Sequence, residues 1–158
     1  MPYLHRITSA RCIQDKCRAG LINAVSSRTM AHAEGWIEAY DALAEGRALP
    51  ETLLSTIRVN RNGLGETMLH WYAIEGDPAV LKKLIGLGFD VNTINSFGRT
   101  PLFECVTIDR WEVVELLLAH GARTDTRDQN GEDIFEYLED NGDRTQAQKL
   151  RKLTSRAT

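Results

Sequence analysis

The sequence predicts an all-α protein in which pairs of short helices are stacked on one another. Three observations lead to this prediction: similar segments recur every 33 residues, each segment carries signals for two helices, and glycines follow the helical segments at matching positions. Residues 65–88 and 98–121 are the clearest copies. Because one such unit cannot bury its own apolar face, a period of this length indicates units that share a continuous core.

The landmarks of the repeat fall into register at this spacing. The aligned positions are Gly65, Gly98 and Gly131; Thr67, Thr100 and Asp133; Leu69, Leu102 and Phe135; Val80 and Val113; Leu84 and Leu117; and Gly88 and Gly121. We therefore expect a helical cap over residues 1–50, a degenerate partial repeat over 51–61, repeats over 62–94 and 95–127, and a partial repeat with a C-terminal cap over 128–158.

The start of the second complete unit predicts a turn followed by a helix. Asn95 to Gly98 are turn-forming residues, and Gly98 can adopt a positive φ. Thr100 is a good N-cap, and Pro101 suits the first helical position. A short helix should therefore run through about Ile108.

A second helix is expected from about Arg110 to His120, with Gly121 ending it. Its wide apolar face consists of Val113, Val114, Leu116, Leu117 and Leu118. In the third unit, Asp133 and Glu136 can form a reciprocal capping box.

The last helix, near 144–154, differs from the others because its apolar stripe is narrow. Ala147, Leu150 and Leu153 form that stripe, and polar or basic residues cover the rest. A one-sided helix at the end of a stack is typical of a solvent-facing cap.

Residues 1–50 show no such register. A helix is expected after Thr8 and Ser9 and another near 29–45, with Gly46 to Pro50 as the connector that follows. We interpret this segment as an N-terminal helical cap; the alternative is a separate functional domain.

The composition is that of a globular protein, with 42% hydrophobic and 26% charged residues among 158. No apolar run approaches the roughly 18 residues that would span a bilayer, and no secretory signal is visible. The three cysteines, Cys12, Cys17 and Cys105, form no disulfide framework and no zinc-like cluster. A cytoplasmic protein without a metal or cofactor is expected.

Charge is distributed unevenly along the chain. The balance is +2 over residues 1–61, −10 over residues 62–143 and +5 over residues 144–158. The repeats are therefore the acidic part, which should repel nucleic acid and favour a basic partner.

No catalytic constellation stands out. Gly63 and Gly65 belong to a turn, since the pattern of a phosphate-binding loop is incomplete. The many carboxylates have no nucleophile in register, so a solvated face is the stronger interpretation. We expect no enzyme, and hydrolysis by clustered carboxylates is the remote alternative.

These residues resemble the ankyrin repeat, a β-turn finger followed by two antiparallel helices. The resemblance covers about residues 58–142 and is carried by Thr100-Pro101-Leu102, by residues 113–122 and by Thr67-Met68-Leu69-His70. It implies a bonding role within the stack for His70. The departures are Met68 in place of proline, Phe103 and Glu136 in place of histidine, and Asp109 in place of a glycine.

The resemblance also implies that a partner protein binds at the finger tips and the concave face of the first helices. The corresponding positions are Leu64, Glu66, Trp71, Ile74 and Glu75; then Phe97, Arg99, Glu104, Thr107 and Ile108, with Trp111 just beyond; and Gln129, Asn130, Glu132, Tyr137 and Asp140. Apolar groups among carboxylates are typical of an interaction surface. The alternative for Trp71, Ile74, Ile108 and Trp111 is that they pack between units or under a cap.

The predicted function is thus a non-enzymatic binding module, monomeric when free, for a basic protein. The compact build resembles small bacterial ankyrin proteins, some of which are immunity proteins that neutralise a toxin. A toxin that cuts nucleic acid would be basic, which suits the acidic repeats. The alternative is a scaffold or adaptor for a cellular regulatory protein.

Overall fold

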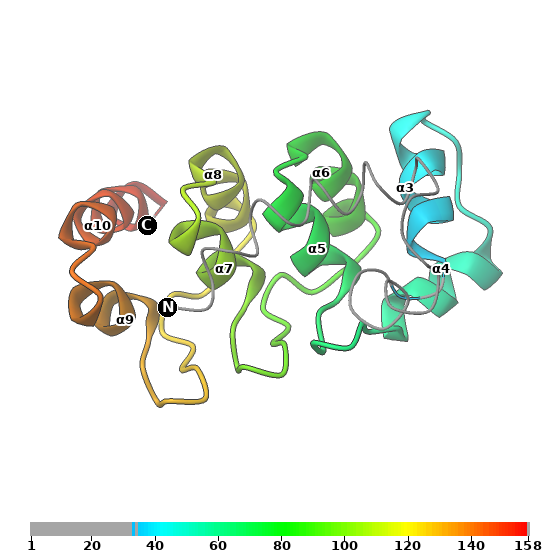
Figure 1. The fold of residues 1–158 in the computed structure, drawn as a ribbon. Coiled ribbons are helices and arrows are strands. Elements are labelled where there is room, and N and C mark those ends of the chain that lie inside the picture. The colour runs from blue at the N-terminus through cyan, green and yellow to red at the C-terminus, as the bar shows by residue number, and fades with distance from the viewer. Residues whose placement is uncertain (1–32, 34, 158) are drawn as a thin grey trace, which may run out of the picture. The chain divides into compact units, whose positions relative to one another are not determined.

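A computed structural model describes residue 33 and residues 35–157. The chain divides into two compact units, with the boundary between Met68 and Leu69. The described residues form helices and no strands, so the predicted all-α class is confirmed. Figure 1 shows the order of the helices. The helix expected after Thr8 lies outside the described residues.

The first unit contains α3 (Trp36–Ala44) and α4 (Glu51–Val59), which pack against each other. Trp36 and Ile57 are fully buried. α3 begins at Trp36, later than the start of the helix predicted near 29–45, because Gly35 precedes it with a φ of 83°, in the left-handed region. Residues 29–32 of that predicted helix lie outside the described residues.

The second unit repeats a helix pair three times. Its helices are α5 (Met68–Glu75, whose first residue lies in the first unit), α6 (Pro78–Gly86), α7 (Pro101–Thr107), α8 (Trp111–Ala119), α9 (Ile134–Asp140) and α10 (Arg144–Ala157). α7 packs on α8, and α10 packs on both α8 and α9. Fully buried leucines, among them Leu81, Leu102, Leu117, Leu138 and Leu150, supply a core that continues from pair to pair.

The predicted helix starts are confirmed. The Thr100 hydroxyl accepts a hydrogen bond from the backbone N–H of Phe103 at 3.3 Å. Asp133 and Glu136 form the reciprocal capping box at the start of α9. These bonds satisfy amides that have no partner inside the helix.

The helix ends also follow the sequence. Gly121 has a φ of 82° just after α8, and Asp109 has a φ of 60° between α7 and α8. Aspartate can occupy this left-handed conformation, which explains why the usual glycine is dispensable there. None of the described helices is both long enough and apolar enough to cross a membrane.

Candidate partner-binding surface

Each of the three finger turns has the same pattern of side-chain hydrogen bonds. Asn62, Asn95 and Asp128 stand 33 residues apart, one at the start of each finger. In each finger the side-chain Oδ1 accepts from the backbone N–H groups two and four residues further on. The two distances are 2.9 and 3.0 Å for Asn62, 2.9 and 3.1 Å for Asn95, and 2.8 and 3.4 Å for Asp128. Each tip is thereby held in one turn conformation.

In the first two fingers the asparagine amide also binds a buried carboxylate. Asn62 Nδ2 donates to Glu66 Oε2 at 2.6 Å, and Asn95 Nδ2 donates to Glu104 Oε1 at 2.9 Å. Glu66 and Glu104 are both 4% exposed. The sequence assigns both to the partner-binding set as water-facing residues, whereas the structure places them where they support the finger turns.

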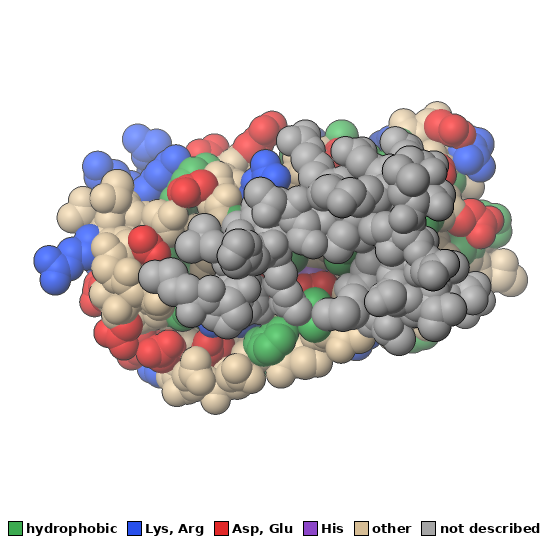
Figure 2. Space-filling view, in the orientation of Figure 1, with side chains coloured by type: hydrophobic (Ala, Val, Ile, Leu, Met, Phe, Trp, Pro, Cys, Tyr) green, Lys and Arg blue, Asp and Glu red, His purple; other side chains and the backbone are tan. Residues whose placement is uncertain are grey.

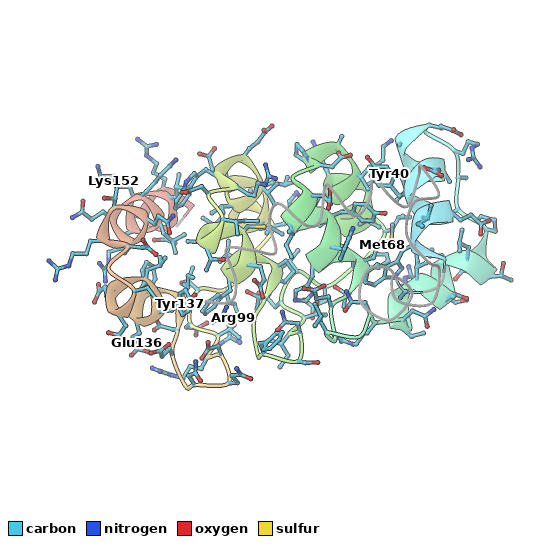
Figure 3. The ribbon with its side chains drawn as sticks, in the orientation of Figure 1. Tyr40, Met68, Arg99, Glu136, Tyr137 and Lys152 are labelled. Carbon is cyan, nitrogen blue, oxygen red and sulfur yellow. The ribbon has the colours of Figure 1, made fainter. Side chains whose placement is uncertain are left out.

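In the third finger Asp128 takes the place of the asparagine, and a buried ion pair takes the place of the bond from the side-chain amide. Asp128 has no side-chain donor, and its Oδ2 accepts instead from Arg99 Nε at 3.3 Å and Nη2 at 3.1 Å. The two side chains are 8% and 0% exposed. The Arg99 guanidinium lies 4.7 Å from the ring centre of Phe103 and 4.5 Å from that of Tyr137. Arg99 and Tyr137, labelled in Figure 3, therefore join the second finger to α9.

The second and third fingers also touch through their backbones. The N–H of Gln129 donates to the carbonyl of Phe97 at 2.8 Å. Gly98, with a φ of 73°, leaves room for this approach, because a Cβ there would lie 3.1 Å from backbone atoms of Asp128 and Gln129. Phe97, half-buried, is thus presented from a fixed turn.

The tips differ in exposure. Leu64 and Phe97 are half-buried, and Asn130 is exposed. Leu64 and Glu66 belong to the first unit, and the other predicted site residues belong to the second. The structure brings Phe97, Arg99, Glu104, Asn130, Glu132 and Tyr137 together around Asn95 and Asp128.

Among the residues of α5, His70 and Trp71 are buried in the interior. His70 is fully buried, and its Nε2 donates to the carbonyl of Arg99 at 3.0 Å, in agreement with a bonding role within the stack. Trp71 is buried as well. Ile74, Glu75 and Ile108 are half-buried.

Trp111 contacts the turn before α8 and the last helix, α10. Its Nε1 donates to Asp109 Oδ1 at 2.8 Å, and Lys149 Nζ of α10 lies 4.2 Å from the centre of its ring. The sequence groups Trp111 with the finger residues, whereas these contacts tie it to α10.

Asn62, Asn95 and Asp128 organise the fingers but are not among the residues predicted for the site. A signal for them is present in the sequence, since residues 62, 95 and 128 recur at the repeat spacing with side chains that form such turns.

Cys105, the one cysteine among the described residues, is buried, and burial raises the pKa of its thiol well above the usual range. It is an unreactive core residue.

Glu132, in the third finger, is a carboxyl whose surroundings disfavour its charged form. Partial burial, a hydrogen bond with Asp140 and the nearby charge of Asp128 raise the pKa of Glu132, and Arg99 opposes them. Glu136 differs, because hydrogen bonds from the Asp133 backbone and from Arg127 lower the pKa of Glu136.

Glu132→Gln is expected to raise the melting temperature at pH 7. A carboxyl whose pKa is higher in the folded protein than in the unfolded chain destabilises the fold when ionised. The gain should shrink as the pH falls through the folded-state pKa and vanish below the ordinary glutamate pKa of 4.5. Glu136→Gln is the opposite control, lowering the melting temperature at pH 7 and losing its effect in acid. A gain for Glu132→Gln that stays constant with pH would contradict the assignment.

A comparison with protein families matches residues 39–128 to the model described as "Ankyrin repeats (3 copies)". Similar curated proteins are human Transient receptor potential cation channel subfamily A member 1, 38% identical over 74 residues, and the Phosphate system positive regulatory protein PHO81 of Saccharomyces cerevisiae, 42% identical over 73. ADP-ribosylation factor GTPase-activating protein AGD2 of Arabidopsis thaliana is 35% identical over 72 residues. These alignments cover 47%, 45% and 46% of the chain but only 7%, 6% and 9% of the relatives.

Proposed function

Because the chain belongs to the ankyrin repeat family, we propose that it is a non-enzymatic module that binds a basic protein through its fingers and first helices. Ankyrin repeats are protein interaction modules in general. The observation that supports a basic partner is the net charge of −10 over residues 62–143. The apolar side chains of Leu64 and Phe97 at the finger tips support binding through the fingers. Positive side chains of a partner would be attracted to this region and oriented before contact.

The fixed geometry of the fingers supports this proposal. The side-chain bonds of Asn95 and Asp128 order the two tips before a partner arrives. Ordered tips lose less conformational entropy on binding, so more of the contact free energy appears as affinity. Phe97, half-buried on such a turn, is the proposed apolar anchor.

The identity of the partner is a further part of the proposal. A nucleic-acid-cutting toxin, neutralised by a cytoplasmic immunity protein of the small bacterial type, has the required positive charge. The alternative is an adaptor for a regulatory protein, and one relative is named as a positive regulatory protein. An array that hydrolyses a substrate with its carboxylates is the remote alternative, and its turnover would persist when Phe97 is removed.

Phe97→Ala combined with Asp140→Lys is expected to weaken capture of the basic partner by at least about thirtyfold, since loss of one anchor typically costs about 2 kcal/mol. The partner would be captured from the native source by the immobilised full chain, identified, and titrated by calorimetry. We expect a one-to-one complex whose affinity falls with salt.

The matched control is Leu116→Ala with Glu115→Lys, which makes the same kinds of change on α8. Leu116 is half-buried and Glu115 is exposed. The control should bind like the natural chain, and both variants should keep a cooperative melting transition. Full affinity of the folded Phe97 variant, or an acidic captured protein, would reject the proposal.

A further inference from the structure

α10 carries a charge opposite to that of the rest of its unit. Residues 144–158 contain 5 Lys or Arg and no Asp or Glu. Residues 69–143 contain 6 basic and 15 acidic side chains, a balance of −9. The two charge types are also separated on the surface, as basic groups gather over α10 and acidic groups lie below them in Figure 2.

The solvent side of α10 carries a row of side chains spaced four residues apart. Residues four apart are neighbours on a helix but lie about 40° apart around its axis, so the row winds slowly over the side away from the buried Ala147 and Leu150. We call it the outer ridge; its members, all exposed, are Arg144, Gln148, Lys152 and Arg156. At a rise of 1.5 Å per residue the outer ridge is about 18 Å long. Lys152 is labelled on α10 in Figure 3.

The other two cations of α10 already have partners. Arg151 Nη2 lies 2.7 Å from Glu139 Oε1 and stacks over Phe135, and Lys149 lies over Trp111. The three cations of the outer ridge differ, because within the described part of the chain none of them is in an ion pair. Their charge is therefore available to another molecule.

The helix dipole acts differently at the two ends of the outer ridge. Arg144 is in the first turn, where the dipole disfavours a cation, whereas Arg156 is in the last turn, where the dipole favours one. Lys152 and Arg156 are four residues apart, a spacing at which like charges repel. These small effects oppose one another, so helix stability does not by itself require a uniformly basic ridge.

We propose that the outer ridge is a second docking surface, which binds an extended acidic peptide segment of a partner protein. Lys152 and Arg156, about one helical turn apart, are separated by about 6 Å along the helix, and Arg144 lies about 12 Å before Lys152. In an extended peptide, alternate residues point the same way at nearly the same interval, about 6.7 Å. Carboxylates at every second residue can therefore meet Lys152 and Arg156 together, and the chain can continue to Arg144.

The surroundings favour a narrow ligand over a broad one. α9 and the turn before α10 lie beside α10 and carry exposed carboxylates. Glu136 and Glu139 pair with Arg127 and Arg151, whereas Asp140 and Asp143 are in no ion pair among the described residues. A membrane or a nucleic acid would bring phosphates near Asp140 and Asp143 and be repelled. A single peptide strand can lie along α10 and avoid them. This surface is separate from the fingers and does not depend on the function proposed for them.

The test uses the full chain and a fluorescein-labelled peptide of alternating Glu and Ser, about 12 residues long so that it exceeds the ridge. Anisotropy at low salt should show binding that weakens as salt is raised. Replacing the three ridge cations by glutamine (Arg144→Gln, Lys152→Gln and Arg156→Gln) should weaken binding about tenfold or more, as expected for three exposed charge contacts. The variant should keep a cooperative melting transition close to that of the natural chain, because the dipole and repulsion effects of the three cations oppose one another.

A matched control removes three exposed cations elsewhere, with Arg47→Gln, Arg58→Gln and Lys82→Gln. It should change the affinity by no more than about twofold, since only long-range attraction is lost. Amide NMR shifts should move mainly over residues 144–157 when the peptide is added. A Phe97→Ala chain should bind the peptide normally, which separates this proposal from that for the fingers.

Four results would overturn the proposal. They are an equal loss in the control variant, shifts concentrated in the fingers, and binding of a single-stranded oligonucleotide or of phosphatidylserine vesicles at least as tight as that of the peptide. The fourth is salt-sensitive self-association of the chain in sedimentation velocity that disappears in the ridge variant, since a second copy would then be the occupant.

Discussion

Asp128→Ala is expected to lower the free energy of unfolding by about 3–5 kcal/mol, the usual cost of breaking a buried ion pair. The change removes the acceptor for two backbone N–H groups of the third finger and leaves Arg99 without its buried partner. Urea unfolding followed by circular dichroism would measure the loss. Few single replacements in the described fingers remove so many contacts at once.

Asp128→Asn is the control that separates the two contributions. Its Oδ1 can still accept from the N–H groups of the turn, as Asn62 and Asn95 do. Only the charge opposite Arg99 is lost, so the destabilisation should be smaller than for alanine. Equal losses for the two variants would show that the turn bonds contribute little and would contradict the shared finger design.

Gly98→Ala is expected to cost about 3 kcal/mol, from the positive φ and from crowding against backbone that cannot move aside. The new Cβ would lie 3.1 Å from Asp128 and Gln129 backbone atoms of the neighbouring finger. Thermal or chemical unfolding would measure the loss, and the anchor Phe97 should be displaced with the turn.

Gly131→Ala is a matched control for that prediction. Gly131 has a φ of 82°, but a Cβ there would meet nothing within 4 Å. Only the conformational penalty remains, so the cost should be about 1–2 kcal/mol. The difference between the two variants measures the contact between the fingers. If both variants lost the same stability, that contact would be absent in solution.

Most of the fold could be predicted from the sequence because its determinants are local and repeated. The helix starts can be predicted from side-chain chemistry alone at Thr100, Pro101 and Asp133, and Gly121 follows a helix end. The 33-residue register then predicts that the helix pairs stack. α3 begins later than the apolar pattern predicts, because that pattern alone does not reveal a left-handed residue such as Gly35.

The site is harder to predict, since it depends on which charged side chains are buried and which are exposed to solvent. Glu66 and Glu104 look like surface carboxylates in the sequence, yet each is buried through a bond from an asparagine amide. Arg99 is buried because an aspartate in the next finger neutralises it. Such pairings join residues 29 apart in the case of Arg99 and Asp128, and no local pattern indicates them.

The most direct test of the central claim is hydrogen exchange of the full chain, free and bound to the basic partner that it captures. Amides slowed by the partner should concentrate in the second and third fingers, residues 95–99 and 128–132, and in α7 and α9. Protection confined to α6 and α8, with the fingers exchanging as in the free chain, would contradict the account.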